Sequence, residues 1–76
     1  MQFNYITLGS VIRKLRIKRG LSQEVLSGLA GIARTHLTMI ENGTKAPNLE
    51  TLYRIAQALD MSASQLLFIV EQEPLK

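Results

Sequence analysis

The chain has 76 residues and a formal net charge of +3, and 46% of its residues are hydrophobic. This length corresponds to one small domain, and the hydrophobic content is too high for a disordered tail. The chain has no cysteine and one histidine, which excludes disulfides and thiolate or histidine-rich metal sites within one chain. The longest apolar run, Leu66–Val70, has five residues, whereas a membrane span needs about 20. Because Met1–Leu8 lacks the features of a secretory signal, we expect a cytoplasmic protein without a membrane partner.

Charged residues are unevenly distributed along the chain. Residues 1–45 carry seven basic and two acidic side chains, a net charge of +5. Residues 46–76 carry two basic and four acidic side chains, a net charge of −2. The basic first half indicates a polyanionic partner such as nucleic acid, but a solvated helix face gives the same pattern. Charge therefore raises the question of DNA binding without answering it.

The spacing of turn residues and apolar residues predicts five short helices. The turn signals are Gly20, Gly31, Asn42-Gly43, Pro47 and Asp60-Met61-Ser62. Between them the apolar spacing is helical, which predicts helices over 8–19, 23–30, 34–42, 49–59 and 62–70. We expect an N-terminal tail over 1–7, a domain over 8–70 and a frayed C-terminus over 71–76. The predicted fold class is all-α, a compact five-helix bundle.

Four polar residues are placed to cap these helices. Ser22 and Asn48 precede the second and fourth helices, where a side-chain oxygen accepts from an unpaired backbone amide. Ser62 and Gln65 fit the reciprocal capping box at the start of the fifth. Gly28 has no evident role inside the second helix, where glycine costs about 1 kcal/mol relative to alanine. The residues expected to face the core include Leu8, Ile12, Leu15, Leu26, Leu29, Leu37, Ile40, Leu49, Leu52, Ile55, Ala56, Leu59, Leu66 and Leu67.

The second and third predicted helices are joined by Gly31-Ile32-Ala33, which is the spacing of a helix-turn-helix. Ser27 supplies the small residue required where the two helices approach, and Ile32 supplies the apolar residue after the turn. At about 100° per residue, the core-facing side of the third helix is opposite an arc of polar residues. The arc carries Arg34, Thr35, Thr38 and Asn42, with Met39 at its border.

The side chains of this arc suit the major groove of DNA. Arginine can bond guanine O6 and N7, and threonine offers a hydroxyl or a methyl group. A surface helix that only has to be soluble would usually carry lysine and glutamate there. An ordinary polar face is the alternative interpretation of the same residues.

A long series of residues occurs in the order and spacing of a known family. The matching residues are Leu8-Gly9, Ile12, Leu15-Arg16, Arg19-Gly20-Leu21-Ser22-Gln23, Leu26, Gly31-Ile32, Leu37, Ile40-Glu41-Asn42-Gly43, Pro47, Leu52, Ile55-Ala56, Ala58-Leu59 and Ser62. On these residues the chain resembles the phage-repressor-type (XRE) helix-turn-helix family, with its lambda-repressor-like DNA-binding domain. Within the family, Arg34-Thr35-His36-Leu37-Thr38 and the short length most resemble the controller proteins of restriction–modification systems.

The resemblance implies a five-helix bundle that binds a pseudo-palindromic operator in double-stranded DNA as a homodimer. The third helix would lie in the major groove, and the second would cross the DNA backbone. The residues that would face bases are Arg34, Thr35, Thr38 and Met39. The residues that would contact phosphates are Ser22, Gln23, His36, Asn42 and Lys45.

Two residues depart from the family's pattern, and two others match an ion pair of the family. Ala33 stands where a serine or threonine usually caps the recognition helix. Met39 cannot make a strong directional hydrogen bond, so it would read groove shape or a thymine methyl. The family places an arginine–carboxylate pair at the positions of Arg16 and Glu41. We therefore expect a partly buried ion pair that ties the first helix to the third.

The apolar end of the fifth helix predicts contact with a second copy of the chain. Its apolar residues are consecutive, so their side chains point around the whole helix, and a monomer of this size cannot cover all of them. The residues assigned to the dimer interface are Met61, Phe68, Ile69 and Val70. In the alternative, Phe3, Tyr5 and Ile6 of the same chain fold over this patch.

The function favoured by these features is sequence-specific, DNA-dependent regulation of transcription, with RNA polymerase as a further candidate partner. An antitoxin-type protein-binding module that also binds DNA is the alternative. We do not expect an enzyme, because the acidic residues show no catalytic pairing and no glycine loop has phosphate-binding spacing. We also expect no catalytic residue, metal, cofactor or small-molecule ligand.

Overall fold

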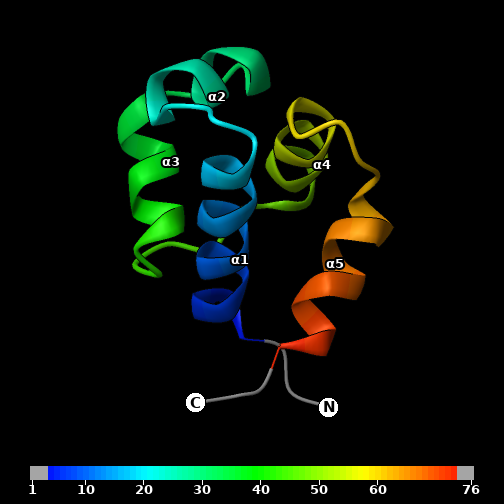
Figure 1. The fold of residues 1–76 in the computed structure, drawn as a ribbon. Coiled ribbons are helices and arrows are strands. Elements are labelled where there is room, and N and C mark those ends of the chain that lie inside the picture. The colour runs from blue at the N-terminus through cyan, green and yellow to red at the C-terminus, as the bar shows by residue number, and fades with distance from the viewer. Residues whose placement is uncertain (1–3, 74–76) are drawn as a thin grey trace.

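The computed structural model describes residues 4–73, which form five α-helices joined by short turns (Figure 1). The helices are α1 (Tyr5–Lys18), α2 (Gln23–Ala30), α3 (Arg34–Glu41), α4 (Leu49–Ala58) and α5 (Ala63–Gln72). Residues 4–73 contain no strand, and the predicted all-α five-helix fold is confirmed. Within this range no helix is both long and apolar enough to cross a membrane.

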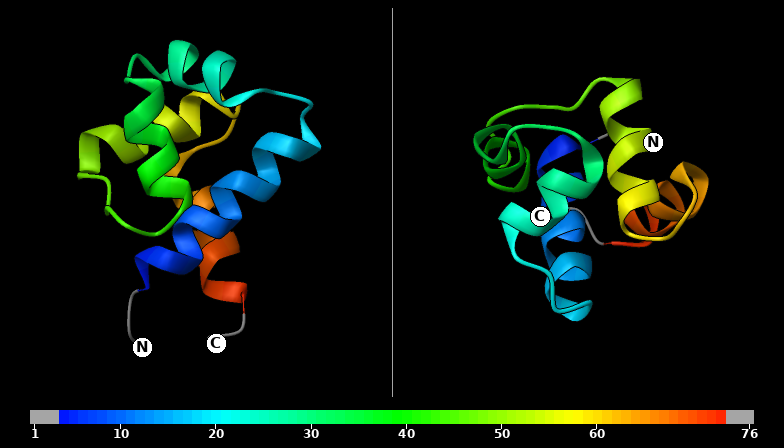
Figure 2. Two further views of the ribbon diagram at one scale, coloured as in Figure 1. Left: turned by 90° about the vertical axis from the view of Figure 1, so that its left-hand side faces the viewer. Right: turned by 90° about the horizontal axis from the view of Figure 1, so that it is seen from above.

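The helix contacts form a closed ring. α1 packs against α3, α3 against α2, α2 against α4, α4 against α5, and α5 returns to α1. Figures 1 and 2 show α3 and α5 on opposite sides of α1, with α2 at the end away from the start of α1. α3 is therefore supported by two helices while its remaining side faces outward.

The predicted caps of three helices are present. The Ser22 side chain accepts a hydrogen bond from the amide of Val25 at the start of α2. Asn48 caps α4 in the same way. Ser62 and Gln65 form the reciprocal capping box of α5. These bonds satisfy backbone amides that have no partner within the helix, which explains where the three helices begin.

α1 begins at Tyr5 rather than at Leu8, because Asn4 caps it by accepting from the amides of Ile6 and Thr7. Tyr5 and Ile6 are exposed, and Ile6 lies beside Gly43, after the end of α3. Ile6 is thus near the end of α3, and it also lines a cavity with Glu73, directly after α5. Phe3, which with Tyr5 and Ile6 was the alternative cover for the apolar end of α5, lies outside the described residues. α5 itself continues to Gln72, beyond its predicted end at Val70.

Side chains from all five helices form one hydrophobic core. The largest fully buried ones are Leu8, Val11, Ile12, Leu26, Leu37, Ile40, Ile55, Leu59 and Leu66. The core positions expected for Leu29 and Leu49 are wrong, because these side chains are 63% and 68% exposed. At about 100° per residue, Leu29 lies about 60° around α2 from buried Leu26. Leu49 is the first residue of α4, and buried side chains begin only at Thr51.

Gly9 lies where α1 crosses α3, and a Cβ atom there would overlap the carbonyl oxygen of Ile40. Because the obstacle is backbone, Gly9→Ala should lower the free energy of unfolding by about 3 kcal/mol, the upper range for overpacking. Gly28 provides the control, since a Cβ atom there meets nothing within 4 Å. Gly28→Ala should raise the free energy of unfolding by about 0.5–1 kcal/mol. Urea denaturation followed by circular dichroism measures both, and equal effects would contradict the close crossing.

Candidate nucleic-acid interface

The turn before α3 has the predicted geometry. Gly31 ends α2 in the left-handed conformation, with φ of 70°. The amide of Ile32 donates to the carbonyl oxygen of Ser27, whose small side chain is buried between the helices. Ala33 makes no side-chain cap at the start of α3, as its identity predicts. The turn therefore sets α2 and α3 against each other through small residues and backbone hydrogen bonds.

α3 has one anchored side and one exposed side. Leu37 and Ile40 are completely buried in the core, together with the side chain of Glu41. The exposed residues of α3 are Arg34, Thr35 and Met39, whereas His36 and Thr38 are half-buried. Asn42 and Lys45 are exposed just beyond the helix. The predicted base-facing residues thus lie on one helix whose other side is fixed by packing.

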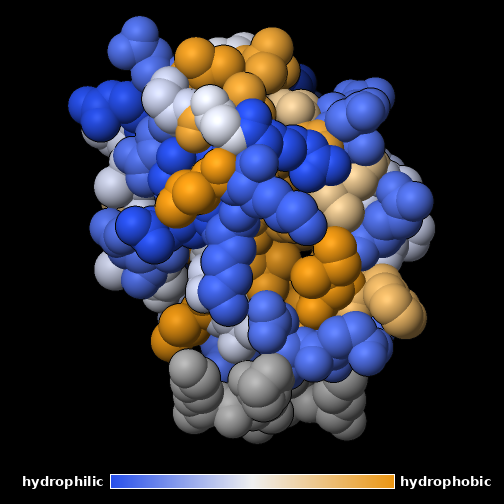
Figure 3. Space-filling view, viewed as in Figure 1, coloured by the Kyte–Doolittle hydropathy of each residue, from blue (hydrophilic) through white to orange (hydrophobic). Residues whose placement is uncertain are grey.

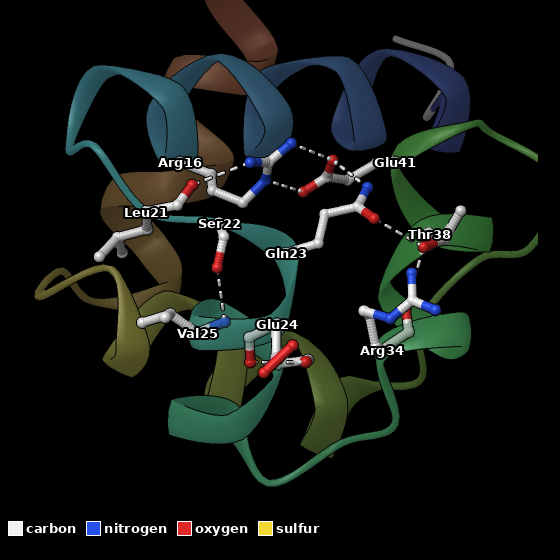
Figure 4. A network of polar contacts seen from close by, with 10 residues as sticks. Arg16, Leu21, Ser22, Gln23, Glu24, Val25, Arg34, Thr38 and Glu41 are labelled. Carbon is white, nitrogen blue, oxygen red and sulfur yellow. Dashed lines mark hydrogen bonds and ion pairs between the residues drawn. The ribbon is translucent and has the colours of Figure 1, made fainter.

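A buried ion pair ties α3 to α1 (Figure 4). Arg16 Nε donates to Glu41 Oε2 at 2.8 Å, and Arg16 Nη2 donates to Glu41 Oε1 at 3.0 Å. Arg16 Nη1 donates to the carbonyl oxygen of Leu21 at 2.9 Å, which also holds the turn before α2. The hydrogen bond to Glu41 raises the pKa of the Arg16 guanidinium above its ordinary value. The pair is bidentate, a geometry that restricts how α3 is oriented on α1.

Gln23 extends this pair toward the exposed side of α3. Its Nε2 donates to Glu41 Oε1 at 3.0 Å, and its Oε1 accepts from the hydroxyl of Thr38 at 2.8 Å. The same hydroxyl lies 3.0 Å from the carbonyl oxygen of Arg34. Figure 4 shows the Gln23 side chain between the Arg16–Glu41 pair and Thr38. One polar network therefore joins α1, the start of α2 and the exposed side of α3.

Sequence reasoning assigned Gln23 to a DNA phosphate and missed these internal bonds. Its amide nitrogen carries two hydrogens and Glu41 takes one, so a phosphate contact by Gln23 stays a prediction. One sequence feature pointed to these internal bonds. Gln23 is the first residue of α2, and the polar residues Thr38 and Glu41 lie one turn apart on α3. Periodicity within one helix does not report such partners, because they lie on another helix.

The predicted dimer residues differ in their exposure. Phe68 is 62% exposed, and Met61 and Ile69 are half-buried. Val70 is only 8% exposed and belongs to the core, so little of its surface is available to a partner and its assignment to the dimer interface stays a prediction. Val70 follows Leu66 by four residues and so shares its inward-facing side of α5.

Comparison with known proteins identifies the family. A profile of the helix-turn-helix family matches residues 12–66. The chain belongs to the phage-repressor-type (XRE) helix-turn-helix family. A relative in Sinorhizobium fredii, an uncharacterised HTH-type transcriptional regulator, is 34% identical over 67 residues, which is 88% of this chain and 87% of the relative. The control protein C.MunI of a Mycoplasma species is 35% identical over 69 residues, 90% of this chain and 93% of the relative.

Solved structures of similar fold include two restriction–modification controller proteins. C.AhdI from Aeromonas hydrophila is 34% identical to this helix-turn-helix chain, with a TM-score of 0.79, covering 82% of this chain and 94% of that one. The C.Esp1396I tetramer in complex with its natural 35 base-pair operator has a TM-score of 0.85 and 24% identity, covering 95% of each chain. Because its identity to this chain is only 24%, the C.Esp1396I structure supports the fold alone.

A double-mutant cycle tests the ion pair that anchors α3 of this helix-turn-helix protein. Replacing either Arg16 or Glu41 strands a buried charge, so Arg16→Met or Glu41→Leu should each lower the free energy of unfolding by about 3–5 kcal/mol. The double variant should lose markedly less than the sum, with a coupling of about 1–3 kcal/mol in urea denaturation.

The exposed pair Arg54–Glu50, with a similar N–O distance of 2.9 Å, is the matched control. Its coupling should be about 0.3–0.5 kcal/mol, because solvent screens both charges. A coupling at Arg16–Glu41 as small as this would refute the anchoring role of the buried pair.

Proposed function

We propose that this chain is a sequence-specific, double-stranded-DNA-binding regulator of transcription that acts as a homodimer on a pseudo-palindromic operator. The observation that carries the proposal is the division of α3 into an anchored side and an exposed side. Leu37, Ile40 and Glu41 are buried, while Arg34, Thr35 and Met39 are exposed. A helix held rigidly from behind positions its outer side chains for base edges at little ordering cost.

The placement of α5 supports a homodimer that leaves α3 free. α3 and α5 lie on opposite sides of α1 (Figures 1 and 2), so a contact through α5 does not occlude the recognition helix. Phe68 is a large exposed apolar side chain on α5. Figure 3 shows hydrophobic residues gathered on the face where α1 and α5 meet. Two modules held together share one ordering cost and read successive major grooves about 34 Å apart.

Relatives support the narrower role of a restriction–modification controller, and we propose that it acts in the cytoplasm. C.MunI and C.AhdI are each about one-third identical to this chain over most of its length. The motif Arg34-Thr35-His36-Leu37-Thr38 carries the resemblance within the recognition helix. A controller that occupies a promoter represses by overlap with polymerase sites or activates by contact with RNA polymerase, which we propose as a further partner.

DNA binding is tested by a mobility shift against the DNA upstream of the protein's own gene and against a scrambled duplex. Arg34→Ala should relax base preference at one operator position and cost about 1–3 kcal/mol of binding free energy. Lys45→Ala should instead weaken binding to both duplexes alike and reduce the salt dependence. If both variants bind as the unaltered protein does, the assignment of the reading face is wrong. Absence of binding to either duplex would contradict the proposed function.

The homodimer is tested by sedimentation equilibrium of Phe68→Arg. A charge at the centre of an apolar contact is left desolvated and unpaired, so the variant should be monomeric at concentrations where the unaltered protein is dimeric. Leu29→Arg is the control, because Leu29 is equally exposed on α2 (63% against 62%) and gains the same charge. A dimer that survives Phe68→Arg, or dissociates equally with Leu29→Arg, would place the interface elsewhere.

A further inference from the structure

The bonds around Thr38 determine which way its hydroxyl proton points. The Gln23 amide has only one suitable orientation, because its other side faces a Glu41 oxygen at 3.0 Å and that carboxylate accepts from Arg16. An amide turned the other way would bring two acceptor oxygens together. Gln23 therefore presents its oxygen, not its nitrogen, to Thr38.

Both neighbours of the Thr38 hydroxyl are acceptors. Gln23 Oε1 lies at 2.8 Å and the carbonyl oxygen of Arg34 at 3.0 Å, and both compete for the single hydroxyl hydrogen (Figure 4). A threonine hydroxyl normally rotates and can either donate or accept. Here the proton is directed into the protein in either case. An external partner can therefore donate a hydrogen bond to the Thr38 oxygen or contact the methyl group.

We propose that Thr38 is a specificity-determining residue that acts toward DNA only as a hydrogen-bond acceptor, and that Gln23 is the positioning residue that imposes this polarity. The inference rests on the proposed function, since it assumes that α3 lies in the major groove. In that groove the donors are the amino groups of adenine N6 and cytosine N4, whereas guanine O6 and N7 and thymine O4 are acceptors. Thr38 therefore selects adenine or cytosine at the base it faces.

The polarity depends on a series of hydrogen-bond partners that begins at the buried Arg16–Glu41 pair. The Arg16 guanidinium is only a donor, Glu41 accepts from it, and Gln23 is oriented by Glu41. The donor or acceptor role of each residue fixes the role of the next one, and the last residue in the series is Thr38. The buried ion pair thus contributes to base choice as well as to helix anchoring, although the side chains of Arg16 and Glu41 are only 11% and 0% exposed.

The test is selection of binding sites from a randomised duplex library by the full chain and by three variants. The unaltered protein should enrich a site in which one position of each half-site is adenine or cytosine. Thr38→Val keeps the shape and methyl group but removes the acceptor, so the preference at that position should fall about three- to tenfold. Thr38→Ser keeps the hydroxyl and should retain the preference. Gln23→Leu removes the nearer of the two acceptors and leaves only the Arg34 carbonyl oxygen at 3.0 Å, so the hydroxyl is held less firmly and guanine or thymine should become partly accepted at the same position.

The outcomes separate this inference from the proposed function. If the unaltered protein enriches no site, the proposed function fails. If a site is enriched and Thr38→Val leaves every position unchanged, the acceptor role is overturned, and a preserved thymine preference would indicate a methyl contact instead. If Gln23→Leu lowers overall affinity without changing base preference, Gln23 is not the positioning residue. Circular dichroism of each variant before selection verifies that it is folded.

Discussion

The attachment of α3 to α1 is the constraint on which the rest of this structure depends. It combines a close backbone crossing at Gly9 and Ile40 with the bidentate Arg16–Glu41 pair. The two contacts are complementary, because the crossing sets how near the helices come and the ion pair limits rotation of α3 about its axis. Rotation of this helix would change which side chains face outward, and with them the chemistry of the reading surface.

The buried charges at this attachment determine geometry as well as stability. A buried ion pair often contributes little net free energy compared with an apolar replacement, but it is specific in its geometry. Here Glu41 accepts from two helices and the carboxylate orients Gln23 as well as Arg16. An apolar contact of the same volume would hold α3 in place but could not determine the direction of hydrogen bonds at the surface.

Much of the fold follows from local sequence signals, and the exceptions have identifiable causes. Caps at Ser22, Asn48 and Ser62 are local, so the helices that they begin were predictable. The start of α1 was expected at Leu8, although Asn4 is a local cap of the same kind and Tyr5 precedes Leu8 by three residues on the same side of the helix. The exposure of Leu29 and Leu49, which were expected in the core, has another cause. Periodicity gives the angle between side chains, but the neighbouring helices decide which face is buried.

The site shows the same division between local and non-local information. The outward position of Arg34 and Thr35 follows from the helix period and the buried leucine and isoleucine opposite. The bonds of Gln23 depend on the distance between two helices, which no spacing within either helix encodes.

The closed ring of helix contacts has a consequence for the order in which the protein is made. Because α5 joins α4 back to α1, a nascent chain that has not yet emerged past residue 62 lacks two of the five contacts of the ring. Its α1–α3 crossing would form without the opposite support of α1. α5 therefore completes the packing around α1, so emergence of residues 63–72 from the ribosome precedes a rigid reading surface.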